Sequence, residues 1–121
     1  MGSFEDLQIY QIAEKLANKI WLIVSKWDYF AKDTIGKQLV RSVDSIGANI
    51  AEGNGRYNHK DKERFIKIAR GSLYETRHWL RLAFARNLLA REDIDKIKPL
   101  VEELSPKLNA YLNSIKKQQN I

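Results

Sequence analysis

Hydrophobic residues recur along this chain at intervals of three and four positions, the spacing that places side chains on one face of an α-helix. The clearest row lies in the first segment and consists of Ile9, Ala13, Leu16, Ile20, Ile23 and Trp27. No stretch alternates strictly between hydrophobic and polar residues, so no β-strand is predicted. The pattern predicts four helices, over about residues 6–27, 34–52, 58–88 and 92–117.

Short connections join these helices, which predicts an all-α fold, an antiparallel up-down-up-down four-helix bundle. The 121 residues suit one hydrophobic core, so we expect a single domain spanning residues 1–121. Pro99 and Pro106 interrupt the fourth helix. Because each proline removes a backbone donor, we expect a kink or a break there.

The third helix carries a predicted core row with both apolar and small polar members: Phe65, Ile68, Ser72, Thr76, Trp79 and Ala83. Gly71 lies inside this helix, where glycine costs about 1 kcal/mol relative to alanine. It indicates either close approach of a neighbouring helix or ordinary sequence drift. Gly53 and Gly55 follow the second helix, where we expect a left-handed C-terminal cap.

Composition excludes several classes of protein. Hydrophobic residues make up 44% and charged residues 30%, which is typical of a globular domain. Cysteine is absent, which excludes disulfide scaffolds, zinc fingers, iron–sulfur sites and thiol nucleophiles, and is compatible with a reducing compartment. The longest apolar run, residues 20–24, is far shorter than the roughly 20 residues that span a membrane. No signal peptide is visible, and we expect a cytoplasmic protein without a membrane partner.

Charge is concentrated in one part of the chain. The whole sequence has 21 Lys and Arg against 15 Asp and Glu, a net charge of +6. Residues 54–91 contain ten of these cations and three anions, a balance of +7, so the rest of the chain is close to neutral. The positive excess therefore lies on the third helix and its flanks.

Seven of these positions share one face of the third helix: Lys60, Arg64, Lys67, Arg70, Tyr74, Arg77 and Arg81. Guanidinium groups suit phosphate oxygens and a tyrosine ring suits base stacking, so this face is a candidate site for RNA or DNA. The alternative is an ordinary solvated face, or one that forms ion pairs with acidic residues of an adjacent helix or subunit.

Three sequence blocks carry a resemblance to a known family: Ser45-Ile46, Asn49-Ile50-Ala51-Glu52-Gly53, and Ala69-Arg70-Gly71-Ser72 followed by Glu75. They closely resemble the 23S rRNA-intervening-sequence proteins, also called S23-type four-helix bundle proteins, and the likeness covers most of the chain. The resemblance implies a small bacterial four-helix bundle, often a homopentamer, with no established enzymatic activity. Members are similar to the accessory variability determinant proteins of diversity-generating retroelements, basic pentameric barrels that engage nucleic acid and a reverse transcriptase.

The signature residues of this resemblance are polar or small: Arg41, Ser45, Asn49, Glu52, Gly53, Gly71, Ser72 and Glu75. If the second and third helices pack antiparallel, we expect these groups to meet in a structural hydrogen-bonded layer. Gly47 and Ala48 would then permit a short separation between the helices. A catalytic carboxylate pair, Glu52 with Glu75, is the functional alternative, but two carboxylates alone are a weak signal.

Other catalytic and ligand-binding patterns are missing from the sequence. His59 and His78 are about 28 Å apart on one predicted helix, so they cannot share a metal ion. The glycines at 53 and 55 lack the Lys-Ser or Lys-Thr of a phosphate loop, and Ser72 lacks a His-acid pair. We therefore predict no catalytic residue, metal, cofactor or small-molecule substrate.

Aromatic residues are numerous, with three Trp, five Tyr and four Phe. Trp21, Trp27, Tyr29 and Phe30 exceed what one bundle core covers, and we expect them at the interface of a homo-oligomer. A pentamer is implied only by the resemblance. The favoured interpretation is a non-enzymatic oligomer associated with nucleic acid. The alternative is a protein–protein adaptor or scaffold, such as a reverse-transcriptase accessory-type subunit, whose arginine face meets an acidic protein.

Overall fold

The computed structural model describes residues 3–119, and every regular element in that range is helical. Four long helices are present, α1 (Gln8–Val24), α3 (Lys37–Asn54), α4 (His59–Ala85) and α5 (Arg91–Gln119). Three short elements accompany them, the 3₁₀ turn η1 (Phe4–Asp6), the single turn α2 (Tyr29–Ala31) and the π-helical turn η2 (Lys32–Gly36). The predicted all-α class with four helices is confirmed.

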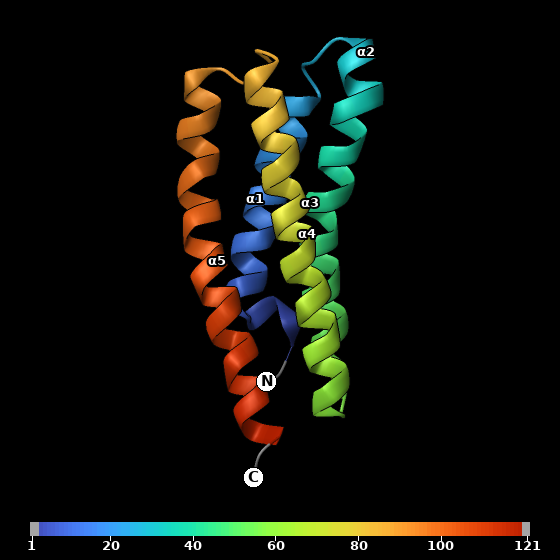
Figure 1. The fold of residues 1–121 in the computed structure, drawn as a ribbon, viewed down its shortest axis with the longest axis vertical. Coiled ribbons are helices and arrows are strands. Elements are labelled where there is room, and N and C mark those ends of the chain that lie inside the picture. Colours follow the sequence, from blue (N-terminus) through green and yellow to red (C-terminus); the bar gives the residue numbers. More distant parts are fainter. Residues whose placement is uncertain (1–2, 120–121) are drawn as a thin grey trace.

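The four long helices lie side by side, and the chain passes up α1, down α3, up α4 and down α5 in Figure 1. Side-chain contacts fix the direction of the central pair. Ser42 of α3 lies beside Thr76 of α4, and Ser45, one turn later, lies beside Ser72, one turn earlier. Therefore α3 and α4 are antiparallel.

All four helices contribute to one hydrophobic core. Its largest fully buried side chains are Leu16, Ile20, Leu39, Val43, Ile46, Ile50, Ile66, Leu73, Leu104, Leu108 and Leu112, together with Thr76. Burying a side chain of this size stabilises the fold by roughly 1.5–3 kcal/mol. The core therefore determines which face of each helix points inward.

The predicted core row of α4 is confirmed at Ser72, Thr76 and Ala83, which are buried, but not at its N-terminal end. Ile66, Ala69 and Leu73 are buried, whereas Phe65 is half-buried and Ile68 is 42% exposed. The cause is that α4 packs against both α3 and α5, so its buried arc is centred between these two neighbours. Phe65 and Ile68 lie at the edge of that arc.

The helical segment containing α3 begins earlier than predicted. Asp28 has an extended backbone, and its Oδ1 accepts a hydrogen bond from the Ala31 backbone N–H at 2.9 Å, so α2 begins at Tyr29. The π-helical turn η2 then continues directly into α3. Gly36 ends this turn, where an added Cβ would lie 2.8 Å from Cγ1 of Val24, so only glycine fits this approach to α1.

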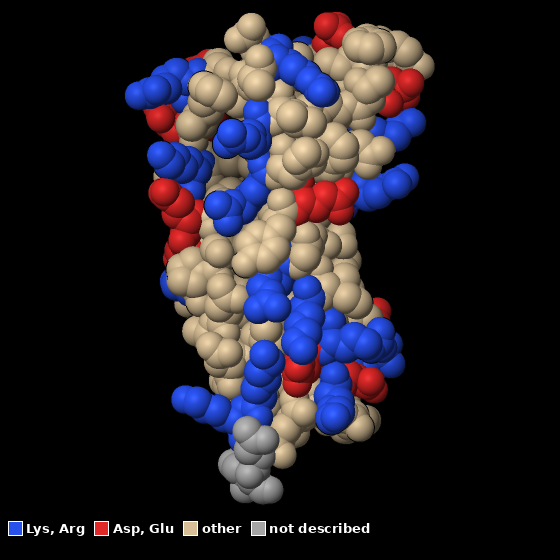
Figure 2. All heavy atoms as spheres, in the orientation of Figure 1, with Lys and Arg blue, Asp and Glu red and all other residues tan. Residues whose placement is uncertain are grey.

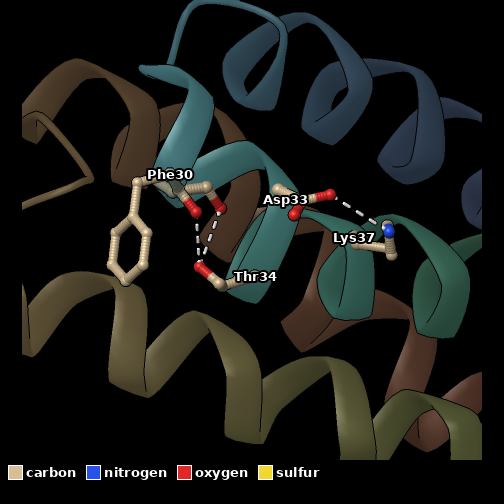
Figure 3. A network of polar contacts seen from close by, with 5 residues as sticks. Phe30, Asp33, Thr34 and Lys37 are labelled. Carbon is tan, nitrogen blue, oxygen red and sulfur yellow. Dashed lines mark hydrogen bonds and ion pairs between the residues drawn. The ribbon is translucent and has the colours of Figure 1, made fainter.

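Two side-chain contacts are formed within and around η2 (Figure 3). The Thr34 hydroxyl donates to the Phe30 carbonyl at 2.7 Å, and Asp33 forms an ion pair with Lys37 at 3.1 Å. Asp33 therefore lies within the helical segment, whereas Asp28 caps its start.

The left-handed cap expected after α3 is absent. Gly55 ends α3 with φ −82°, in the right-handed region, and Gly53 lies buried inside the helix. A Cβ on Gly53 would lie 3.0 Å from the Cβ of Phe65 in α4. Glycine is therefore favoured at position 53, because the two helices come so close there that Phe65 would have to move for a larger residue.

The other expectations for helix interiors have mixed outcomes. An added Cβ on Gly71 would have nothing within 4 Å, so no neighbouring helix of the described chain approaches it. The helix α5 runs without a break through Pro99 and Pro106. Both prolines are exposed, so the carbonyls that lose a partner lie on the solvent side, where water can hydrate them.

Across residues 3–119, no helix has the length and apolar character needed to cross a membrane.

Substituting Gly53 and Gly71 distinguishes the effect of close packing on stability from the effect of helix propensity. Gly53→Ala should lower the free energy of unfolding by about 1–2 kcal/mol because the added methyl group would force Phe65 to move by a few tenths of an ångström. Gly71→Ala should raise it by about 0.5–1 kcal/mol because the site is open and alanine favours helix. Urea denaturation measures both values, and equal effects of the two substitutions would contradict the close approach at Gly53.

Candidate nucleic-acid interface

All seven residues predicted to form the basic face lie on the outward side of α4. Six of them are exposed and Arg70 is half-buried, while Tyr74 in the middle of the row is 52% exposed. Figure 2 shows Lys and Arg side chains gathered along this side, in one group toward the upper end of α4 and another toward its lower end. We call these seven residues, from Lys60 to Arg81, the basic face.

Only one cation of the basic face is neutralised within the described chain. Lys67 forms an ion pair with Glu63 of the preceding turn, with 2.6 Å between Nζ and Oε2. Hydrogen bonds from Lys67 and from Gln119 of α5 lower the pKa of the Glu63 carboxyl below its ordinary value. The Glu63 carboxylate therefore already accepts from two donors, Lys67 and Gln119.

The remaining cations have neutral partners or none. Arg70 donates to the Asn109 side chain of α5 at 3.3 Å, and the Arg64 guanidinium lies over the Phe65 ring at 4.6 Å. Lys60, Arg77 and Arg81 have no ion pair within residues 3–119. Pairing with acidic residues of an adjacent helix in the same chain therefore does not explain the basic face.

The signature residues form part of the predicted hydrogen-bonded layer between α3 and α4. The hydroxyl oxygens of Ser45 and Ser72 are 2.9 Å apart, and the Asn49 amide donates to the Ser45 hydroxyl at 3.0 Å and to its carbonyl at 2.8 Å. Because these contacts join α3 to α4 near their midpoints, they fix the register of the two helices.

Two further residues of this layer, Ser42 and Thr76, were not predicted from the sequence to form polar contacts. The buried Thr76 donates to the Ser72 carbonyl at 2.8 Å and lies 3.0 Å from the Ser42 hydroxyl, which in turn donates to the Leu39 carbonyl. The usable signal was the presence of Thr76 in the predicted core row, since a buried hydroxyl requires a partner.

The charged signature residues do not join the layer. Arg41 is exposed, and Glu52 forms an ion pair with Arg56 at 2.9 Å. Glu75 instead accepts a hydrogen bond from the Trp79 indole at 3.1 Å. The structure thus gives Glu52 and Glu75 separate partners and does not bring them together as a carboxylate pair.

The residues expected at an oligomer interface cluster near one end of the bundle. Trp21 is 60%, Tyr29 79% and Phe30 77% exposed, and Leu22, which was not predicted, is 62% exposed. Trp27 differs from these, because it is half-buried and packs against the core. The end of α1 and the start of α2 therefore present a group of large apolar side chains to solvent, and its role in assembly stays a prediction.

Histidine and acidic residues offer no metal centre in the described part of the chain, where no three such groups converge. His59 has a buried Nδ1 without a hydrogen-bond partner at the start of α4, and His78 is exposed beside the Trp79 ring. The two histidines lie on different turns of α4, as their spacing predicted.

Comparisons with known proteins agree on one family. The family model described as 23S rRNA-intervening sequence protein matches residues 5–110. A crystal structure of a protein of unknown function from the S23 ribosomal protein family of Bacteroides thetaiotaomicron is similar, with a TM-score of 0.76 and 25% identity over 86% of this chain and 97% of that one. None of the curated proteins matches the chain.

Removing one hydroxyl of the α3–α4 layer should destabilise the fold without changing its shape. Thr76→Val should lower the free energy of unfolding by about 1–2 kcal/mol because Ser42 and the Ser72 carbonyl lose a buried partner. Thr34→Val, which removes an exposed hydroxyl, is the control and should change it by less than about 0.5 kcal/mol. In denaturant titrations, a Ser42→Ala/Thr76→Val double variant should lose less stability than the sum of the single losses, and strict additivity would contradict a coupled layer.

Proposed function

Since the chain belongs to the 23S rRNA-intervening sequence protein family, we propose that it is a non-enzymatic, homo-oligomeric protein of the cytoplasm that binds nucleic acid through the basic face of α4. One observation carries the proposal. Of the six Lys and Arg side chains on this face, only Lys67 is ion-paired within the described chain. The other five present a row of uncompensated positive charge.

A phosphate backbone matches this row in charge and in hydrogen-bonding chemistry. Arginine forms paired hydrogen bonds to phosphate oxygens, and each neutralised phosphate releases condensed counterions into solution. Tyr74, which is half-exposed among the arginines, offers a ring on which a base can stack. The face therefore supplies both components of a contact that does not depend on sequence.

Assembly would multiply these contacts. Trp21, Leu22, Tyr29 and Phe30 expose large apolar surfaces at one end of the bundle, and such patches mark protein interfaces. A closed ring repeats the basic face once per subunit, which turns several weak contacts into strong overall binding. The pentamer that the resemblance implies is one such ring.

The same apolar group favours the alternative function, an adaptor or scaffold for another protein. In that case the aromatic end of the bundle is the working surface, and the arginines contact acidic side chains of the partner. The two functions differ in one respect, because an adaptor without nucleic-acid contacts shows no binding to RNA or DNA.

Reversing two charges of the basic face tests the proposal. Arg64→Glu with Arg77→Glu should weaken binding to an RNA or DNA oligonucleotide at least tenfold, measured by fluorescence anisotropy, while circular dichroism stays unchanged. Lys15→Glu with Lys26→Glu alters two exposed lysines of α1 and its C-terminal flank by the same net charge and should retain most of the affinity. Equal losses in the two variants would show that only overall charge matters and would remove the assignment to α4.

The aromatic end of the bundle should control assembly. Light scattering should find an oligomer for the unaltered chain at micromolar concentration and a monomer for Trp21→Asp with Phe30→Asp, because the exposed apolar area then carries charge. Tyr57→Asp changes an even more exposed aromatic residue in the loop at the opposite end and should leave the oligomer intact. A monomeric unaltered chain would contradict the assembly proposed here.

A further inference from the structure

A groove of about 410 Å³ lies between the C-terminal part of α4 and the N-terminal part of α5. Its volume falls within the range of roughly 300–1,000 Å³ that is typical of sites for small organic groups. The side chains that form its floor are all apolar, namely Leu80, Phe84, Leu89, Ile94, Ile97 and Val101. This region occupies the upper part of the bundle in Figures 1 and 2.

Four cations surround this apolar floor: Arg77 and Arg81 from α4, and Arg91 and Lys98 from α5. No Asp or Glu is among the described residues that line the groove. Arg91 has an acidic neighbour, Asp95, but the contact is long at 3.8 Å and both side chains are largely exposed, so it neutralises little. The groove therefore favours a group that is flat and apolar in its body and negatively charged on its outside.

An unstacked nucleotide has this combination, because its base is a flat ring and its phosphates are anionic. A duplex does not offer it, since the flat faces of its bases are stacked against one another and only base edges, sugars and phosphates reach the surface. Phe84, which lines the groove, is 60% exposed, and Arg77 and Arg81 lie seven and three positions before it on the same side of α4. An aromatic ring next to paired guanidinium groups is the arrangement by which proteins hold single strands.

Resting on the function proposed above, we infer that this groove seats an unstacked base, and that the protein consequently prefers single-stranded over double-stranded nucleic acid. Phe84 is the stacking platform, and Arg77 and Arg81 hold the phosphates that flank the seated base. Tyr74, one turn before Arg77, provides a second ring further along the strand. Because the floor has no polar side chain to read base edges, the preference for single strands is independent of base sequence.

The test compares oligothymidylate with a duplex of the same length at one salt concentration, again by fluorescence anisotropy. The unaltered protein should bind the single strand about tenfold more tightly than the duplex. Phe84→Ala should weaken single-strand binding about tenfold and leave duplex binding within about twofold. Phe84→Trp, which keeps a ring, should preserve the preference. Tyr57→Ala removes an exposed aromatic ring from the loop between α3 and α4, outside both the groove and the apolar end of the bundle, and should change neither affinity.

Each outcome of this test has a distinct meaning. Equal affinity for the two nucleic acids, or Phe84→Ala weakening both alike, would overturn the single-strand inference and leave polyanion binding by the basic face in place. Binding of neither would overturn the function proposed above and the inference with it. Displacement of the oligonucleotide by an acidic amphipathic peptide, with loss of peptide binding in both Phe84→Ala and Phe84→Trp, would assign the groove to a protein partner and overturn the inference.

Discussion

The close approach of α3 and α4 is the constraint on which the rest of the structure depends. At Gly53 a side chain would press against Phe65 of α4, and the hydroxyl groups of Ser42, Ser45, Ser72 and Thr76 fix the register of the two helices. One side of α4 packs against α3, and the neighbouring side of α4 therefore packs against α5 and the core. The remaining side, with its Lys and Arg, can only face solvent.

Such a charged row is unfavourable for the isolated helix. Like charges four positions apart, as at Lys60 and Arg64 or at Arg77 and Arg81, each cost an α-helix roughly 0.2–0.5 kcal/mol. Stability alone would favour alternating signs, as at Glu63 and Lys67. A polyanion that binds along α4 removes this repulsion, so the arrangement has a physical use in a complex that it lacks in the free protein.

Much of this architecture follows from sequence patterns, and the exceptions have physical causes. Helical periodicity predicted the four helices, and charge spacing predicted the exposed basic face. Periodicity could not reveal that Gly53 serves close packing, because a glycine near a helix end is equally typical of a cap. It also placed Ile68 in the core, since one helix read alone does not show that two neighbours share its buried arc. The groove at Phe84 combines residues from two helices and their connection, which no linear spacing indicates.

The most direct test of the account is the dependence of single-strand affinity on salt for the unaltered protein. Each neutralised phosphate contributes about −0.7 to the slope of log affinity against log salt concentration on a single strand. The five cations of the basic face that have no ion pair in the described chain therefore predict a slope of about −3.5 or steeper, with larger values if several subunits engage one strand. A slope near zero, which means that affinity does not change with salt, would show that the outward charges of α4 do not contact phosphate.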